Sequence, residues 1–384
     1  MLQPPVPGAV ALVHDWLVSQ RGGENVLLTL ARMFPEAPIY TLVHGAGRVH
    51  PELERRIIHT SFIQRLPGAP RRFRPYLPLF PRAVEAWDLS AYDTVISTSH
   101  CVAKGIRTHA GQRHVAYIHT PMRYLWDQMP HYLPRPARLW TPLARLAAWP
   151  LRRWDVTSAQ RPDVLVANSE FVAARIGRVW GRASEVIYPP VDVDFFAAAP
   201  DPAARRGFVA VSALVPYKRL ELAIGLANAR RLPLTVVGEG AERARLRALA
   251  GPTVRFEHGL SREALRALYA GAEALLFAGE EDFGIVPVEA MAAGCPVIAF
   301  DAGGLRETVV GEGEGATGVF FGTPSVAAMG RALDTFLERR DRGAFGRAAL
   351  TAQARLFAPE RFTAAMARLL SQGCGAQAPL RRAV

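Results

Sequence analysis

The sequence predicts an α/β fold with two domains, each built on a doubly wound parallel sheet. Short apolar runs alternate with helical patterns along the chain, which is typical of parallel strands covered by helices on both faces. This alternation occurs twice, on either side of a proline-rich stretch near residue 190. With 384 residues, half of them hydrophobic, the chain is long enough to bury two cores.

The expected strands are apolar runs bounded by turn residues, and helical patterns separate them. In the first half they cover residues 9–13, 39–43, 93–98, 113–118 and 163–168. In the second half they cover residues 207–213, 232–238, 253–259, 272–278, 295–300 and 316–321.

These elements predict four successive parts of the chain. The N-terminal domain is expected over residues 1–188 and the C-terminal domain over residues 205–358. Residues 189–204 are expected to form a linker, because the proline pair at its start opposes regular structure. Residues 359–384 are expected to form a final helix, packing back toward the N-terminal domain, and a tail.

The positive charge of the chain is unevenly distributed. The net charge is +12, and residues 1–190 hold 23 basic and 13 acidic side chains, which leaves +2 for the second half. A basic N-terminal half indicates an anionic partner, such as a membrane surface, nucleic acid or a phosphorylated substrate. The alternative is an arginine-biased composition, since the chain has two lysines, but this bias does not explain the difference between the halves.

Cysteine usage and hydropathy predict a cytoplasmic protein. Cys101, Cys295 and Cys374 form neither a metal-ligand spacing nor a disulfide framework, which favours a reducing compartment. The first apolar run lacks a basic region before it and ends at His14, so it is expected to be a buried strand and not a signal peptide. No window of about 18 uncharged apolar residues predicts a spanning helix.

The stretch "GEEDFGIVPVEAM" (279–291) is the most specific candidate site. It follows an expected strand and opens a helix near Pro287. Gly284 frees the backbone, so that the N–H groups of Phe283 to Ile285 can face a diphosphate or a sugar.

Two acids bracket this stretch. Glu289, expected on the first turn of the helix, can accept hydrogen bonds from ribose hydroxyls, as an acid does in dinucleotide sites. Glu281 lies in the loop and can bind sugar hydroxyls. The alternative is a helix-capping acid beside an unrelated surface acid.

Other candidates also follow expected strands. Lys218 and Arg219 lie at a helix start, where cations are unfavourable unless an anion binds. His119 directly follows a strand and is equally compatible with a structural role. Glycine turns that could cradle a phosphate or line a cleft contain Gly22, Gly23, Gly238, Glu239, Gly303 and Gly304.

No metal site is expected. Asp192 and Asp194 form a DxD pattern, but they lie in the expected linker without a third ligand.

Together these residues resemble glycosyltransferase family 4, whose members are retaining, nucleotide-sugar-dependent enzymes. The resemblance spans nearly the whole chain and is strongest at the two acids separated by seven residues and followed by "EAMAAGCPVIAFDAGG". The stretches "HDWL", "RGGE", "YIHTPMRYLWD", "VANSEFVAARI", "VIYPPVDVDFF" and "LVPYKR" resemble a bacterial mannosyltransferase-like subgroup of cell-surface polysaccharide biosynthesis. The resemblance implies the GT-B fold, two Rossmann-like domains facing across a cleft.

The resemblance also implies roles for the candidate residues of the second half. Glu289 would bind the ribose and Glu281 the donor sugar, with backbone contacts from residues 283–285. Lys218 would bind the diphosphate. Many family members carry an arginine five residues before this lysine, where this chain has Ala213, so Arg219 is a candidate for the second cation.

In the first half, the resemblance places Gly23 near the diphosphate and His119 near the reacting sugar. The expected reaction is a metal-independent, retaining transfer of a hexose, with GDP-mannose as the favoured donor and no cofactor. A UDP- or dTDP-sugar transferase, a nucleotide-sugar epimerase of the same fold and a basic nucleic-acid-binding protein are the alternatives.

The acceptor is expected to be a lipid-linked saccharide met by the N-terminal half. Residues 63–87 and 136–155 interleave arginines with aromatic residues, a pattern that suits an anionic membrane surface. We therefore expect a peripheral protein on the inner face of the plasma membrane. The alternative is a set of core helices with arginines on their outer faces.

Overall fold

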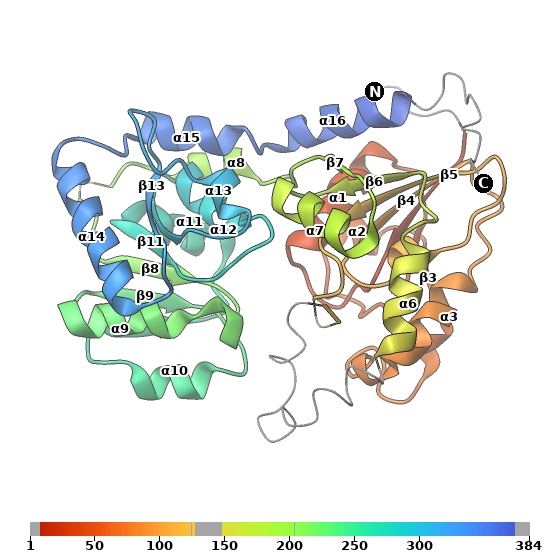
Figure 1. Ribbon diagram of the computed structural model, residues 1–384, viewed down its shortest axis with the longest axis horizontal. Coiled ribbons are helices and arrows are strands. Elements are labelled where there is room, and N and C mark those ends of the chain that lie inside the picture. Colours follow the sequence, from red (N-terminus) through yellow and green to blue (C-terminus); the bar gives the residue numbers. More distant parts are fainter. Residues whose placement is uncertain (1–7, 124, 127–147, 203, 373–384) are drawn as a thin grey trace. The chain divides into compact units, whose positions relative to one another are not determined.

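The computed structural model describes residues 8–123, 125–126, 148–202 and 204–372. The chain divides into two compact units, each with its own parallel sheet (Figure 1). The first unit comprises Met1–Asn168, Val172–Pro190 and Glu360–Val384, and the second comprises Ser169–Phe171 and Val191–Pro359. Two parallel-sheet α/β units confirm the predicted fold class.

The first unit is built on a seven-stranded sheet with the order β3-β2-β1-β4-β5-β6-β7. Its five predicted strands form close to their expected positions. Two short edge strands, β3 and β7, were not predicted, because an edge strand needs no continuous apolar run. The strands are β1 (Val10–His14), β2 (Ile39–Thr41), β3 (Ile58–Thr60), β4 (Thr94–Ser99), β5 (Arg113–Ile118), β6 (Val164–Ala167) and β7 (Glu185–Val186).

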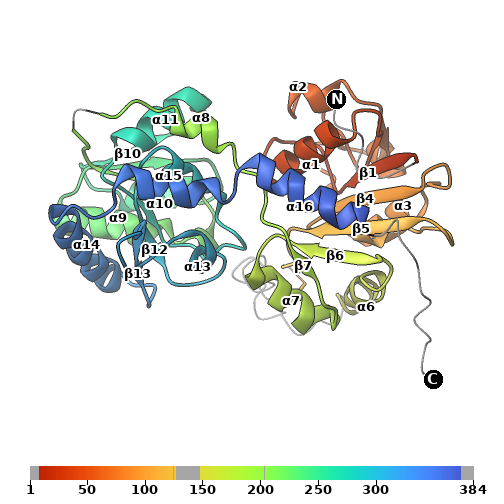
Figure 2. The same cartoon turned by 90° about the horizontal axis from the view of Figure 1, so that it is seen from above.

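Helices cover both faces of this sheet, as the apolar strands require. The C-terminal helix α16 lies beside α1 on one face (Figure 2), where Phe362 packs edge-on against Tyr117 of β5. The helices are α1 (Gly22–Met33), α2 (Pro51–Glu54), η1 (Phe62–Arg65), η2 (Arg74–Leu79), α3 (Phe80–Glu85), η3 (Ala103–Gly105), α6 (Trp149–Ser158), α7 (Glu170–Trp180) and α16 (Pro359–Ser371).

A buried lysine ties η3 to α6 in the first unit. The Nζ atom of Lys104 lies 2.8 Å from Oδ1 of Asp155, and both side chains are almost completely buried. The indole N–H groups of Trp126 and Trp180 donate to Oδ2 of Asp155 at 2.9 and 2.8 Å. The ammonium also lies 4.9 Å from the ring centroids of Trp154 and Trp180. Each charge is therefore satisfied without solvent, as a buried ion pair requires.

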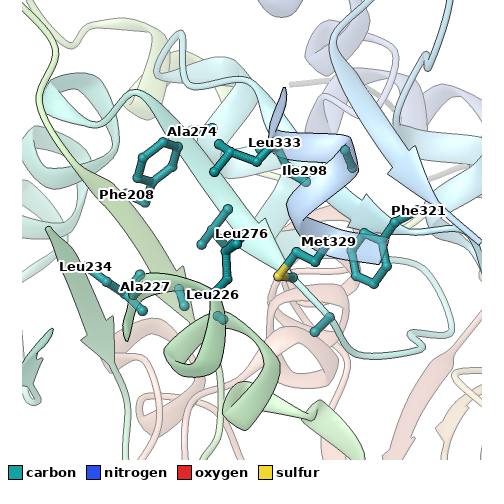
Figure 3. Close-up of a cluster of buried hydrophobic side chains, with 14 of the residues drawn as sticks. Phe208, Leu226, Ala227, Leu234, Ala274, Leu276, Ile298, Phe321, Met329 and Leu333 are labelled. Carbon is teal, nitrogen blue, oxygen red and sulfur yellow. The ribbon is translucent and has the colours of Figure 1, made fainter. Parts of the chain in front are cut away.

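The second unit is built on a six-stranded sheet with the order β10-β9-β8-β11-β12-β13. All six predicted strands are present. Five of them are mostly buried, and the edge strand β10 alternates half-buried and exposed residues. The strands are β8 (Phe208–Val211), β9 (Leu234–Val237), β10 (Val254–Glu257), β11 (Ala274–Phe277), β12 (Val297–Phe300) and β13 (Gly318–Phe321). Figure 3 shows part of its core, where Met329 and Leu333 of α14 lie among Leu276, Ile298 and Phe321 of the strands.

The helices of this unit include one inside the predicted linker. Within residues 189–204, α8 forms because Val193 and Phe196, one turn apart, are both buried, and Phe196 packs against Tyr269 with 5.9 Å between ring centroids. The helices are α8 (Val193–Ala197), η5 (Pro216–Lys218), α9 (Leu220–Arg230), α10 (Arg243–Leu249), α11 (Arg262–Gly271), α12 (Ile285–Ala292), α13 (Leu305–Thr308), α14 (Val326–Asp341) and α15 (Arg347–Arg355). Within the described part of the chain, no helix is both long and apolar enough to cross a bilayer.

Each sheet has one place where the strand order reverses. In the first unit it lies between β1 and β4, and in the second it lies between β8 and β11. In open α/β sheets, ligands bind beyond the carboxyl ends of the strands at such a switch point. These two strand pairs therefore position the candidate sites.

Candidate functional site

The switch point of the second unit holds Lys218 and Glu281. Lys218 ends η5 after β8, and Glu281 follows β11. The ammonium of Lys218 pairs directly with the carboxylate of Glu281, and the two side chains are 12% and 20% exposed. Gly279 permits this approach, because a Cβ atom there would lie 3.1 Å from Cα of Lys218. The sequence therefore predicted two residues that the fold brings into contact.

The glycine pair Gly303–Gly304 holds the loop of Glu281. Gly303 forms a parallel bridge with Glu281, and the amide of Gly304 donates to the carbonyl of Glu281 at 2.9 Å. A Cβ atom on either glycine would collide with a carbonyl of Glu281 or Asp282. The Gly304 amide is thus used within the protein, and a ligand cradle formed by the other amides of residues 300–308 stays a prediction.

Gly284 starts α12 earlier than predicted. Its φ of 102° lies in the left-handed region, and a Cβ atom there would lie 2.7 Å from Cδ2 of Leu305. The helix begins at Ile285 and not near Pro287. Glu289 therefore lies on the second turn of this helix, whereas the sequence predicted that it would lie on the first turn.

The carboxyl group of Glu289 is poorly solvated. Burial raises its pKa to about 8, and the nearby charge of Arg262 only partly opposes this effect. The hydroxyl of Tyr269 on α11 donates to Oε2 of Glu289 at 3.5 Å, a long hydrogen bond. A carboxyl group with so little hydration is stabilised by hydrogen bonds from partners such as hydroxyls.

Arg219 lies beside this site in an unusual backbone conformation. Its φ of 52° is left-handed, which is uncommon for a residue other than glycine. The guanidinium carbon lies 5.2 Å from the ring centroid of Phe300, and its Nη1 atom is buried without a hydrogen-bond partner among the described residues. A buried donor of this kind can serve an anion.

The turn at Gly238 and Glu239 is structural. The amide of Gly238 donates to the carbonyl of Glu257 at 3.0 Å, and the carbonyl of Glu239 accepts from the amide of Leu214 at 2.8 Å. These bonds fix the segment that leads from β8 to Lys218. The Gly238 amide is thus used within the protein, and a role of Gly238 and Glu239 in lining a ligand site stays a prediction.

The first unit brings Gly23 and His119 together. Gly22 and Gly23 begin α1, and His119 follows β5. A Cβ atom on Gly23 would lie 3.4 Å from Nε2 of His119 and 3.7 Å from Cε1 of His14. The missing side chain thus leaves the helix N-terminus facing two imidazoles.

His14 and Glu24 belong to this cluster but were not singled out in the sequence. Nδ1 of His14 lies 2.6 Å from Oγ1 of Thr98, and its Nε2 lies 3.9 Å from Oε1 of Glu24. Glu24 also accepts from the amide of Arg21 at 3.0 Å. Burial would raise the pKa of Glu24, but His14 lowers it overall. The sequence feature that could have identified His14 was its position at the end of an expected strand.

Only some residues of the predicted basic and aromatic surface are exposed, although all were expected to be. Phe73 and Phe80 are buried in the core against Trp16, with ring centroids 5.1 and 6.4 Å from it, so they are not available to a membrane. Phe62 and Leu79 are 39% and 41% exposed. The exposed arginines of this segment are Arg65, Arg71, Arg72, Arg74 and Arg82.

The second predicted segment contributes one exposed aromatic residue among the described positions. Trp149 is 56% exposed, and the guanidinium carbon of Arg153 lies 5.6 Å from its ring centroid. Trp154 instead belongs to the cluster around Lys104. Arg138, Trp140 and Arg145 lie outside the described residues.

Two doubly wound sheets, with site residues gathered at the strand ends of each, define a GT-B fold. Thermosynechococcus elongatus sucrose-phosphate synthase has the same fold, with a TM-score of 0.74 and 19% identity over 96% of this chain and 100% of that one. Anabaena HepE, solved in complex with UDP-glucose, superposes with a TM-score of 0.67 and 17% identity over 95% of this chain and 100% of that one. At these identities the likeness concerns the fold alone.

Models of sequence families assign the chain to a family, which the likeness of fold alone does not. The model "Glycosyltransferase Family 4" matches residues 20–195, and "Glycosyl transferases group 1" matches residues 195–352. Together the two models cover residues 20–352, so the chain belongs to glycosyltransferase family 4, as its motifs predicted.

Curated relatives match over part of their length. A GDP-mannose-dependent alpha-mannosyltransferase of Mycolicibacterium smegmatis is 36% identical over 185 residues, which are 44% of this chain and 46% of the relative. A GDP-mannose-dependent alpha-(1-6)-phosphatidylinositol monomannoside mannosyltransferase of Mycobacterium tuberculosis is 34% identical over 225 residues, 50% of this chain and 58% of the relative. The chain thus spans about half the length of the curated relatives it matches.

Proposed function

We propose that this glycosyltransferase moves a mannosyl group from GDP-mannose to a hydroxyl of a lipid-linked saccharide, with retention of configuration. The observation that carries the proposal is the contact between Lys218 and Glu281 at a switch point, with Glu289 on the adjoining helix. The relatives named as GDP-mannose-dependent support the choice of donor.

The three side chains suit the three parts of a nucleotide sugar. Glu289 can accept from the ribose hydroxyls, and Glu281 can accept from hydroxyls of the sugar. Lys218 can bind the diphosphate, with Arg219 as a second cation. Lys218 and Glu281 neutralise each other in this structure, and a bound donor would give each of them a partner of its own.

The same residues can stabilise the charge that develops during transfer. The bond from the sugar C1 to the phosphate oxygen breaks, and a bond from C1 to the acceptor oxygen forms on the same face. The acceptor proton passes to the departing phosphate oxygen, while Lys218 stabilises the negative charge there, without a metal ion. By the family resemblance, Gly23 and His119 of the first unit contribute near the diphosphate and the sugar.

Nucleotide binding provides the first test of the donor. GDP at about 100 times its dissociation constant should raise the melting temperature of the wild type by about 5 to 10 °C, because ligands that bind the native state stabilise it by mass action. UDP, dTDP, ADP and CMP should have smaller effects. The measurement is differential scanning fluorimetry at matched nucleotide concentrations.

Two variants make this measurement specific. Glu289→Ala should lose most of the GDP shift, whereas Glu263→Ala, an exposed acid on α11, should keep it. A larger shift with UDP or dTDP would replace the proposed donor. The absence of a shift with every nucleotide would contradict the donor site itself.

We also propose that the exposed arginines of residues 65–82 hold the enzyme at the inner face of the plasma membrane, where a lipid-linked acceptor lies. Leu79 lies within this segment and Phe62 three residues before it, and both exposed side chains can enter the interface. Residues 1–190 carry a net charge of +10, which attracts anionic lipids.

Vesicle sedimentation tests this surface. The triple substitution of Arg71, Arg72 and Arg74 by Ala should weaken binding to vesicles of three parts phosphatidylcholine and one part phosphatidylglycerol by about 100-fold, because each basic residue near such a surface contributes about 1 kcal/mol. Binding should also fall with added salt.

A charge-matched variant controls for net charge. It replaces Arg247, Arg331 and Arg342 of the second unit, which are exposed, by Ala. Equal loss of binding in both triple variants, or binding insensitive to salt, would refute the proposed membrane surface.

A further inference from the structure

The switch point of the first unit holds an aspartate and a histidine that the proposed function has not used. Asp15 follows β1 and His100 follows β4, the two strands between which the strand order reverses. Ligands bind beyond such strand ends in open α/β sheets. The corresponding place in the second unit holds Lys218 and Glu281, to which the donor is assigned.

Asp15 fixes the loop that carries His100. The side chain of Asp15 is completely buried. Its Oδ2 accepts from the amides of His100 and Cys101 at 2.7 and 2.8 Å, and its Oδ1 accepts from the next two amides at 2.7 Å each. Burial would raise the pKa of Asp15, but nearby imidazoles and these hydrogen bonds lower it overall. With four acceptor positions filled by backbone amides, Asp15 holds the loop in place and is not a proton acceptor.

The imidazole of His100 is placed for a ligand. Its Nδ1 lies 3.3 Å from Oδ2 of Asp15, and its side chain keeps 28% exposure. The negative charge of Asp15 beside Nδ1 favours a hydrogen on that nitrogen, although the acceptor positions of this carboxylate are filled, which leaves Nε2 as a hydrogen-bond acceptor. Burial lowers the pKa of His100, and the charges of His14 and Arg74 lower it further. The charges of Asp15 and Glu24 raise it, but by less. A neutral imidazole suits a hydroxyl better than a phosphate.

Packing connects His100 to the basic surface of the first unit. Trp16 lies edge-on to His100, with 4.3 Å between ring centroids at an interplanar angle of 90°. Trp16 also packs against Phe73 and Phe80, which belong to the segment with the exposed arginines. The His100 ring also lies 6.2 Å from that of His119. His100 is therefore close both to the residue assigned to the reacting sugar and to the packing beneath the proposed membrane surface.

We propose that His100 contacts the acceptor saccharide by accepting a hydrogen bond from one of its hydroxyls, and that Asp15 is the residue that positions it. This inference rests on the proposed function, because it assigns residues to the acceptor side of that transfer.

The test uses GDP-mannose as donor and octyl α-mannoside as probe acceptor. Transfer to the probe and hydrolysis of GDP-mannose by water are measured for the wild type, His100→Ala and His100→Gln. His100→Ala should lower kcat/KM for the probe about tenfold, mainly through the KM of the probe, because one hydrogen bond to the substrate is lost. Hydrolysis and the KM for GDP-mannose should stay within about twofold of the wild type.

Controls separate contact from structure. His100→Gln retains an acceptor and should recover part of the transfer, and His109→Gln, an exposed histidine between β4 and β5, should match the wild type. Asp15→Asn replaces one acceptor oxygen by a donor and should also raise the KM for the probe. The His100 variants keep the test decisive if the Asp15 variant does not fold.

Each contrary outcome points to a different failure. Unchanged transfer in both His100 variants would overturn the contact and leave the proposed function intact. Parallel loss of transfer, hydrolysis and thermal stability would show a structural role for His100 and would also overturn the inference. A wild type that neither transfers mannose to the probe nor hydrolyses GDP-mannose would refute the proposed function itself, and this inference with it.

Discussion

Lys218→Met should lower kcat for mannosyl transfer by about 100-fold or more, because it removes the cation assigned to the departing diphosphate. The substitution keeps the length of the side chain and its packing near Tyr217 and Phe277, whose ring centroids lie 5.2 and 6.0 Å from Nζ. The measurement is the rate of radiolabelled mannose transfer from GDP-mannose at saturating acceptor.

The contact between Lys218 and Glu281 makes this prediction more specific. If both side chains act on one donor, the double variant Lys218→Met/Glu281→Gln should be little worse than the poorer single variant, since residues that act as a unit are not additive. Arg230→Met, which removes an exposed cation from α9, should keep wild-type activity. A Lys218→Met enzyme with more than about a tenth of wild-type activity would contradict the assignment.

Lys104→Met should lower the free energy of unfolding of the first unit by about 3 to 5 kcal/mol, because it leaves the buried charge of Asp155 without its ionic partner. The measurement is urea denaturation followed by tryptophan fluorescence. All seven tryptophans lie within residues 1–190, so the signal reports on the first unit and not on the second.

Two further variants test the cause of this loss. Lys104→Met/Asp155→Leu removes both charges and should recover part of the stability, because no uncompensated charge remains, although the indole N–H groups of Trp126 and Trp180 lose their acceptor. Arg32→Met breaks a pair with Glu52 in the first unit, whose side chains are 54% and 35% exposed, and should cost less than about 1 kcal/mol. A loss below about 1 kcal/mol for Lys104→Met would mean that the buried pair is not important for stability.

The fold class was predictable because parallel strands buried on both faces leave a clear pattern. Five of the six strands of the second unit are short, mostly apolar runs, the sixth alternates apolar and charged residues, and each was expected close to its observed position. The edge strands Ile58–Thr60 and Glu185–Val186 were missed, since they are short and partly exposed. The helix Val193–Ala197 was missed because its local proline content gave no sign of the apolar surface that it covers.

The candidate site was predictable where single residues follow strands, but not where distant segments meet. Lys218, Glu281 and Glu289 could each be located from the strand before them. The use of the Gly304 amide by Glu281 depends on contact between two loops, which no local pattern encodes. Asp15 and His100 are 85 positions apart and lie outside the glycine-rich turns, so their partnership required the sheet order.

The packing of α16 affects the order in which the two units can be completed during synthesis. Phe362, Met366, Leu369 and Leu370 form part of the core on the α1 face of the first unit. The guanidinium of Arg113 in β5 also donates to backbone carbonyls of α16. On the ribosome, the second unit therefore has all its residues before the first does, and the apolar side chains of β5 that pack against α16 stay uncovered until residue 370 emerges. A chaperone that binds nascent chains would find its site on the part of this protein that is made first.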